Sequence, residues 1–125
     1  MELIQNFIDG QHISSDSSES LDIYEPATGG VYGQLRDSNA NDIDHAVRSA
    51  KTAFVLWSDL TVRERAVHLN NIAKGIEKRL DEFAEIESRD TGKPIALSRS
   101  LDIPRSVLNF KFFAEYANNF EFKFY

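Results

Sequence analysis

The side chains best suited to recognise a ligand lie late in the chain, at Arg105 and Asn109. Arg105 follows Pro104 and stands between the apolar residues Ile103 and Val107, in a segment with helical spacing. A guanidinium offers paired donors to a planar anion, so this arginine could bind a carboxylate, with Asn109 one helical turn further along. An arginine on a solvated helix face is the alternative, and the sequence leaves both interpretations open.

A second candidate is Asp90, which lies between two predicted helices in the segment RDTGK at 89–93. Its simplest role is a helix-capping or turn carboxylate. Gly92 and Lys93 resemble the end of a phosphate-binding loop, but the upstream glycine and the following Ser or Thr of that motif are missing. The pattern therefore argues against a phosphate loop here.

The remaining reactive side chains give no catalytic arrangement. The sequence contains no cysteine, which excludes a thiol nucleophile, a disulfide and a thiolate metal site within these residues. Three isolated histidines have no partner one turn away and are predicted to lie on the surface: His12, His45 and His68. Four acidic residues form a solvated helix face: Asp81, Glu82, Glu85 and Glu87.

The composition is that of one folded domain. The chain has 125 residues, 42% hydrophobic, with a net charge of -6 from 20 acidic and 14 basic residues. This charge argues against binding to nucleic acid or to a membrane surface. No apolar run is long enough to span a membrane, and the first residues do not resemble a secretory signal, so we expect a cytoplasmic protein.

The first forty residues predict short strands joined by turns. Asp9 and Gly10 favour a tight hairpin turn between residues 7–8 and 12–13. A strand ending at Pro26 and another over residues 31–35 enclose a glycine-containing turn. Gly29, Gly30 and Gly33 lack the spacing of a dinucleotide-binding loop, so we interpret them as turn residues.

From residue 42 the apolar period becomes that of a helix. The pattern predicts helices over 42–57, 61–88 and 95–118, the second beginning with a capping box from Thr61 to Glu64. Asn39 or Asn41 can cap the first helix, and Pro104 is expected to bend the third. Residues 120–125 alternate apolar and charged, which predicts the start of a strand that pairs elsewhere. We therefore interpret the chain as the first part of a larger protein.

Several motifs occur in one order along the chain: FIDGQ at 7–11, EPATG at 25–29, DIDHAV at 42–47, FVLW at 54–57, RER at 63–65, ESRDTGKP at 87–94 and FFAEYA at 112–117. Together they resemble the N-terminal quarter of the NAD(P)-dependent aldehyde dehydrogenase superfamily. Glu25, Gln11 and His12 depart from the residues usual in that family. The segment DIPRSVLNF at 102–110 is similar to the branch that oxidises 2-hydroxymuconic and 2-aminomuconic semialdehydes.

The resemblance implies an α/β fold, as an incomplete portion of a Rossmann-like dinucleotide-binding domain. It also implies NAD-dependent oxidation of an aldehyde to a carboxylic acid through a cysteine thioester, in a homodimer or homotetramer. The nucleophile, the glutamate base and the main cofactor contacts lie downstream in such proteins. No catalytic or cofactor-binding residue is therefore assigned in this chain.

Two sites are implied within the chain itself. Arg105 and Asn109 would bind the carboxylate of a semialdehyde acid. Asp90 would join the backbone carbonyls of Ile23 and Tyr24 around a structural Na+ or K+, because one carboxylate with carbonyl oxygens suits a hard cation better than zinc. The alternative hypothesis is a stand-alone, non-catalytic interaction domain derived from such an enzyme.

We expect the 125-residue chain by itself to be inert, because it has neither a thiol nucleophile nor a phosphate-cradling loop. Incubation of the purified chain with NAD+ and a range of aldehydes should give no increase in NADH absorbance. Calorimetric titration with NAD+ should give no binding heat. Aldehyde-dependent NADH formation would contradict the assignment of the catalytic residues to another part of the protein.

Overall fold

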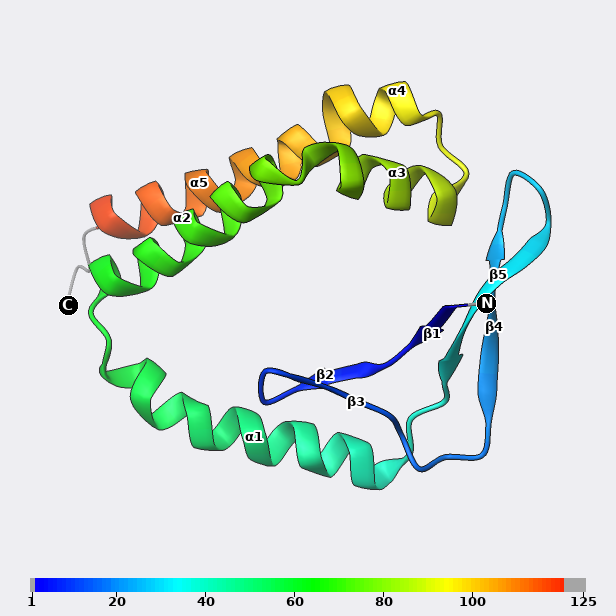
Figure 1. Ribbon diagram of the computed structural model, residues 1–125. Helices are drawn as coiled ribbons and strands as arrows, with labels where there is room; N and C mark the ends of the chain where they lie inside the picture. Colours follow the sequence, from blue (N-terminus) through cyan, green and yellow to red (C-terminus); the bar gives the residue numbers. More distant parts are fainter. Residues whose placement is uncertain (1, 121–125) are drawn as a thin grey trace. The chain divides into compact units, whose positions relative to one another are not determined.

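The computed structural model describes residues 2–120 and contains two compact units, of which the first ends at Ser58 and the second begins at Asp59. The first holds five strands followed by one long helix: β1 (Glu2–Ile4), β2 (Asn6–Ile8), β3 (Gln11–Ile13), β4 (Ser20–Glu25), β5 (Gly30–Arg36) and α1 (Ala40–Asp59). The second is built from helices: α2 (Val62–Lys78), α3 (Leu80–Thr91), α4 (Ile95–Leu97), the π-helical segment η1 (Ser98–Asp102) and α5 (Ile103–Asn119) (Figure 1). The α/β class is confirmed.

Two small sheets make up the strand part of the first unit. One has the order β1-β5-β4, with β1 parallel and β4 antiparallel to β5. The other is the β2-β3 hairpin, in which Phe7 pairs with His12. Asp9 and Gly10 have φ values of 54° and 74°, as a tight turn with two left-handed residues requires. The hairpin predicted from these two residues is confirmed.

The glycines that superficially suggest a nucleotide loop serve the β4-β5 connection. The Gly29 amide donates to the Glu25 carbonyl at 2.8 Å, and Gly29 has a φ of 70°. Gly30 begins β5, and Gly33 pairs with both neighbouring strands. Because none of the three opens a helix, the interpretation as turn and strand residues is confirmed.

A side-chain network fixes the start of α1. The side-chain oxygen of Asn39 accepts hydrogen bonds from the backbone amides of Asn41 at 2.9 Å and Asp42 at 3.2 Å. The backbone amide of Asn39 in turn donates to the Asp42 carboxylate at 2.9 Å. The Ser15 hydroxyl also donates to that carboxylate. These hydrogen bonds, from Ser15 first and Asn39 second, hold the pKa of the Asp42 carboxyl below its ordinary value of 3.8.

The apolar stripe of α1 is not covered within the described chain. No residue of α1 is buried. Ile43 is 57% exposed and Phe54 is 63% exposed, although their spacing is that of an amphipathic helix. The periodicity therefore identified the helix and its apolar face correctly, while the part of the protein described here leaves that face open.

The prediction of one helix over residues 61–88 is wrong, because the structure contains two. The capping box begins α2 as expected, with Thr61 and Glu64 bonded reciprocally, and these bonds lower the pKa of Glu64. The chain then leaves helical geometry at Arg79, with φ −114° and ψ 27°. Arg79 pairs with Glu82 and lies over the Phe83 ring, so side-chain contacts hold this corner. The apolar residues keep their helical spacing across Arg79, and no Gly or Pro stands at the break. The sequence pattern therefore gives no sign that the helix is interrupted there.

The predicted helix over 95–118 is also interrupted. Three residues of α4 lead into η1, whose defining hydrogen bond runs from the Ile103 amide to the Ser98 carbonyl, five residues back. Pro104 then lies in the first turn of α5, where a missing backbone donor is tolerated. The irregularity that Pro104 was expected to cause thus takes the form of a π-turn just before it.

Small side chains form the core of the second unit. Helices α2 and α5 lie side by side (Figure 1) and make the most extensive helix contact of the unit. Ala66 and Ala73 are the buried residues of α2, while Ile103, Val107 and Ala114 are those of α5. Alanines at these positions let two helix axes approach closely.

The predicted strand at 120–125 lies almost wholly outside the described residues. Phe120 follows α5 in an extended conformation, with φ −77° and ψ 118°. Residues 121–125 are not described, so the strand and its pairing stay predictions. Among the helices between residues 2 and 120, none has both the length and the apolar character needed to cross a membrane.

The Asp42 network predicts a pH dependence of stability. A lowered folded-state pKa means that the ionised carboxylate stabilises the fold above the ordinary value, and that this contribution is lost as the pH falls through the folded-state pKa. We expect Asp42→Asn to lower the free energy of unfolding near neutral pH. The difference from wild type should shrink below about pH 4.

Urea unfolding at a series of pH values measures this difference. Asp44→Asn is the matched control, since Asp44 is on the same helix and accepts no hydrogen bond from another described residue. Equal, pH-independent effects of the two substitutions would contradict the role given to Asp42.

Candidate functional site

Arg105 and Asn109 lie one turn apart on the exposed side of α5. Both side chains are exposed, whereas Ile103 and Val107 face the interior at 8% and 4% exposure. The sequence-predicted pair is therefore brought together on one helix face, because residues four apart lie above one another. Neither side chain bonds to another residue of the described chain.

The two basic residues of α5 have different surroundings. Lys111 is paired with Glu77 of α2, with both carboxylate oxygens at 3.2 Å from its Nζ. Arg105 has no acidic partner within residues 2–120. Its guanidinium therefore keeps its donors available for a ligand carboxylate.

An apolar groove lies beside this pair. It has a volume of about 300 Å³ and is lined by Ser106, Asn109, Phe110 and Phe113. Phe113 is 59% exposed and packs edge-to-face on Phe112. The lining offers aromatic rings to a hydrocarbon chain and the Asn109 amide to a polar group, while Arg105 lies one turn before Asn109 and outside the lining.

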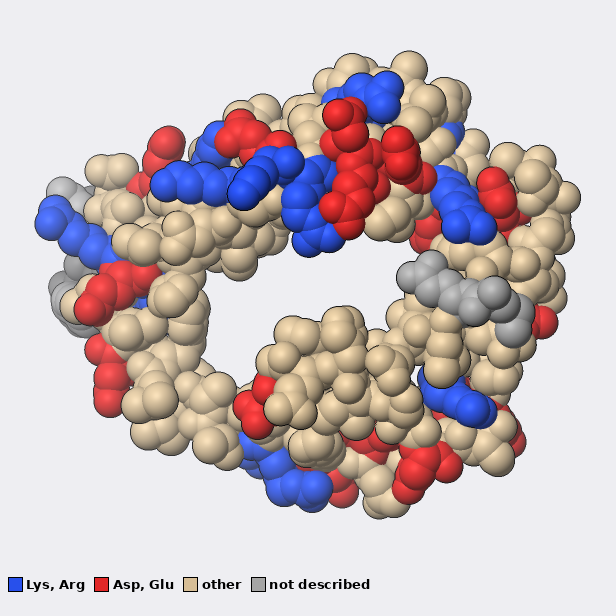
Figure 2. Space-filling view, viewed as in Figure 1, with Lys and Arg blue, Asp and Glu red and all other residues tan. Residues whose placement is uncertain are grey.

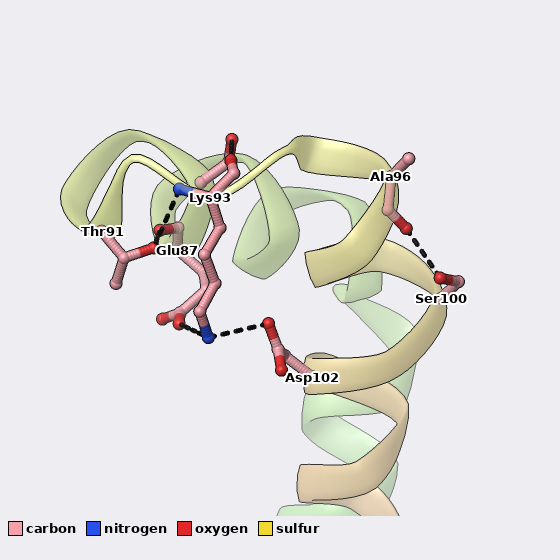
Figure 3. A network of polar contacts seen from close by, with 7 residues as sticks. Glu87, Thr91, Lys93, Ala96, Ser100 and Asp102 are labelled. Carbon is pink, nitrogen blue, oxygen red and sulfur yellow. Dashed lines mark hydrogen bonds and ion pairs between the residues drawn. The ribbon is translucent and has the colours of Figure 1, made fainter. Parts of the chain in front are cut away.

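The loop after α3 contains a polar network that the sequence did not reveal (Figure 3). The Lys93 ammonium lies 3.0 Å from Asp102 and 3.4 Å from Glu87. Asp102 is the main cause, and Glu87 a smaller one, of a raised Lys93 pKa. The Ser88 hydroxyl donates to the Lys93 carbonyl at 2.6 Å. This lysine is a charged structural link, which agrees with rejecting a phosphate loop at this position.

The three residues predicted to hold a cation lie in different units. Ile23 and Tyr24 belong to β4, at the point where the pairing with β5 shifts register. Both residues lie inside the strand pairing, because Glu25 after them still pairs with Gly30. The end of the strand at Pro26 therefore does not free their carbonyls. The register shift between Ile23 and Tyr24 disrupts the hydrogen-bond ladder locally, and such a shift can leave a backbone carbonyl available to a cation.

Asp90 is exposed in the last turn of α3, which ends at the left-handed residue Gly92. Its convergence with the β4 carbonyls stays a prediction. Over the described part of the chain, no three His, Cys, Asp or Glu side chains gather as metal ligands. The proposed site does not depend on such a group, because it uses a single carboxylate.

The glycines of this chain do not fit a cofactor phosphate site. Such a site needs a glycine turn that leads from a strand into a helix N-terminus. Here Gly10, Gly29 and Gly30 serve hairpin connections, while Gly75 is inside α2 and Gly92 ends α3. Residues 2–120 therefore contain no glycine turn of the kind that holds the NAD pyrophosphate.

Some basic side chains of the second unit do have acidic partners. Figure 2 shows Lys and Arg lying next to Asp and Glu along the helices of the second unit. These pairs include Arg99 with Asp81, at 2.8 Å, and Lys111 with Glu77. Arg63, Arg65 and Lys74 also have no acidic partner within residues 2–120, so Arg105 is singled out by its place one turn from Asn109 and not by the lack of a partner.

Sequence comparison identifies the class of protein. A model of the aldehyde dehydrogenase family matches residues 12–124. The chain belongs to the aldehyde dehydrogenase family.

Individual relatives point to a branch of that family. The chain is 46% identical over 112 residues to 2-aminomuconic semialdehyde dehydrogenase from Homo sapiens. The matched region covers 90% of this chain and 23% of the relative. It is 39% identical over 120 residues to 2-hydroxymuconic semialdehyde dehydrogenase from Pseudomonas sp. (strain CF600). The matched region covers 95% of this chain and 25% of the relative.

Solved structures agree with the assignment to the aldehyde dehydrogenase family. A crystal structure of PnpE in complex with nicotinamide adenine dinucleotide matches with a TM-score of 0.88 and 37% identity, over 94% of this chain and 24% of that one. An NAD+ complex of an aldehyde dehydrogenase from Bacillus cereus matches with a TM-score of 0.88 and 32% identity, over 96% and 25%. The chain thus spans about a quarter of the length of the relatives it matches.

Proposed function

We propose that this chain is the N-terminal portion of an NAD-dependent aldehyde dehydrogenase that oxidises a semialdehyde acid, such as 2-hydroxymuconic or 2-aminomuconic semialdehyde, to the carboxylic acid. The observation that carries this proposal is the free guanidinium of Arg105, one turn from Asn109 and beside an aromatic groove. An aldehyde with a second, anionic end needs such a receptor, whereas a neutral aldehyde does not.

Within this proposal the chain recognises the far end of the substrate and does not carry out the chemistry. It has no cysteine, so the thiolate that forms the thioester belongs to another part of the enzyme. NAD serves as hydride acceptor in the complete protein, and the glycine positions described above give this chain no share in holding its phosphates. The complete protein is expected to act as a homodimer or homotetramer.

We also propose that Asp90 and the carbonyls of Ile23 and Tyr24 hold a structural Na+ or K+. The chemistry of the donors supports this, because hard monovalent cations take carboxylate and carbonyl oxygens. The negative end of α3 lies at Asp90, where a cation is electrostatically favoured.

A stand-alone interaction domain is the second candidate. An aromatic stripe at the end of α5 favours it. Phe112 and Tyr116 are more than half exposed and stack on each other, and the Phe120 ring, just after the helix, lies tilted against Tyr116. Exposed aromatic surface of this kind is typical of protein–protein interfaces. The coding sequence after Tyr125 discriminates the two: a continuing frame with a cysteine supports the enzyme, and a natural stop supports the interaction domain.

The carboxylate receptor is tested by substrate selectivity in the complete enzyme. We expect Arg105→Gln to lower kcat/KM for a semialdehyde acid about 100-fold, because removing a charged partner of a bound anion costs a few kcal/mol. The same variant should leave a neutral aldehyde of equal length nearly unchanged.

Lys111→Gln is the matched control, since it removes a positive charge from the same helix that is already paired with Glu77. It should not change the ratio between the two substrates. An equal loss on both substrates in Arg105→Gln would show that the arginine does not recognise the carboxylate.

The cation site is tested by crystallography. Crystals of the complete enzyme grown with Rb+ should show an anomalous peak within about 3 Å of oxygens from Asp90 and from Ile23 or Tyr24. Asp90→Asn should abolish the peak, whereas Glu85→Gln, on the exposed side of the same helix, should keep it. A peak that persists in Asp90→Asn, or no peak in the wild type, would refute the site.

A further inference from the structure

The π-turn η1 changes the register of the helix that carries the candidate site. Its hydrogen bond spans five residues instead of four, so the turn accommodates one more residue than an α-helical turn. Each residue advances an α-helix by about 100°. One additional residue therefore rotates everything that follows by about a quarter of a turn.

This rotation decides which side chains of α5 are buried. Ser98, at the start of η1, is fully buried at 0% exposure. In an uninterrupted α-helix, the period of about 3.6 would place positions 105 and 109 on the same line as Ser98. The structure instead buries Ile103, Val107 and Ala114.

Arg105 and Asn109 are consequently exposed because of the π-turn. With regular helical register they would face the interior beside Ser98, where a guanidinium without a partner would be costly. The buried stripe of α5 begins anew at Ile103, directly after η1. The turn is thus the element that places the candidate substrate residues on an accessible face.

Polar and charged side chains hold this turn, and Figure 3 shows those at its C-terminal end. Lys93, in the loop after α3, reaches Asp102, the last residue of η1, at 3.0 Å. The Ser100 hydroxyl donates to the Ala96 carbonyl at 2.7 Å, within the irregular segment. Arg99 of the turn pairs with Asp81 of α3 at 2.8 Å.

We infer that Lys93 and Asp102 are positioning residues, which hold the π-turn in the register that presents Arg105 and Asn109 to the carboxylate of the substrate. This inference rests on the proposed function for the identity of the ligand. The register itself concerns this chain alone, so it can be measured without any activity.

The first test uses thiol labelling of the complete enzyme with its own cysteines replaced by serine; this chain contributes none of them. Asn109→Cys and Val107→Cys place single thiols on the exposed and buried sides of α5. A maleimide should label position 109 at least about tenfold faster than position 107, since buried sites react only through local opening.

Adding Lys93→Met or Asp102→Asn should reduce this ratio by about half or more, because the turn loses its ionic link and its register is less well fixed. Lys93→Arg should restore it. Far-UV circular dichroism identifies variants that have lost their helices. An unchanged ratio in a folded Asp102→Asn variant, whose side chain has the same shape, would overturn the inference.

The second test uses the complete enzyme. Lys93→Met and Asp102→Asn should each raise KM for a semialdehyde acid about tenfold, because a displacement near 1 Å of a binding group is costly. They should leave kcat and the KM for a neutral aldehyde unchanged. The double variant should be no worse than either single one, since both remove the same link.

Arg105→Gln in the same assay separates the two proposals. If Arg105→Gln leaves the KM for the acid unchanged, the proposed function fails, whatever the labelling shows. If Arg105→Gln raises that KM while Lys93→Met and Asp102→Asn do not, the positioning inference fails and the proposed function stands. Equal losses on acid and neutral aldehyde in the Lys93 and Asp102 variants would show a general structural role and would also overturn the inference.

Discussion

The close packing of α2 against α5 is the constraint on which the second unit depends. Ala66 and Ala73 present almost no side-chain bulk, so α5 can approach with Val107 and Ala114 turned inward. A helix packed this tightly cannot rotate without placing larger residues in the interface. The contact therefore holds α5 in the rotation that the π-turn η1 sets, and the candidate site lies on the outward face.

The same packing explains why so little large apolar surface is buried. The fully buried positions are occupied by alanine and serine, whereas Phe54, Leu56 and Phe112 are each more than half exposed. Folded proteins usually bury their large aliphatic and aromatic side chains first. Apolar faces of this extent are typical of surfaces that other protein covers, in agreement with a chain that matches a quarter of its relatives.

Local signals in the sequence predicted much of this fold. Asp9 and Gly10 specified the hairpin, and Thr61 with Glu64 specified the start of α2, because each depends on neighbours within a few residues. Periodicity located the helices but missed the corner at Arg79, which neither Gly nor Pro announces. The sequence also placed Arg105 and Asn109 on one helix face, because they are one turn apart, while their role toward a substrate stays a prediction.

The features that sequence reasoning missed depend on distant partners or on helix register. The pairing of Lys93 with Asp102 joins two elements through side chains nine residues apart, which no helical or strand period connects. Ser15 and Asp42 are 27 residues apart, and only the folded chain brings them together. A π-turn leaves the composition of a helix unchanged, so the interruption at η1 has no sequence signature comparable to a proline.

The π-turn also bears on how such a segment can change over generations. Because η1 holds one residue more than a regular helical turn, loss of one codon within η1 would let α4, η1 and α5 form a continuous helix. Arg105 would then keep its exposed face, because the deletion removes the one residue that the π-turn accommodates. The π-turn thus lets this segment carry an additional residue without changing which faces the helices on either side of it present.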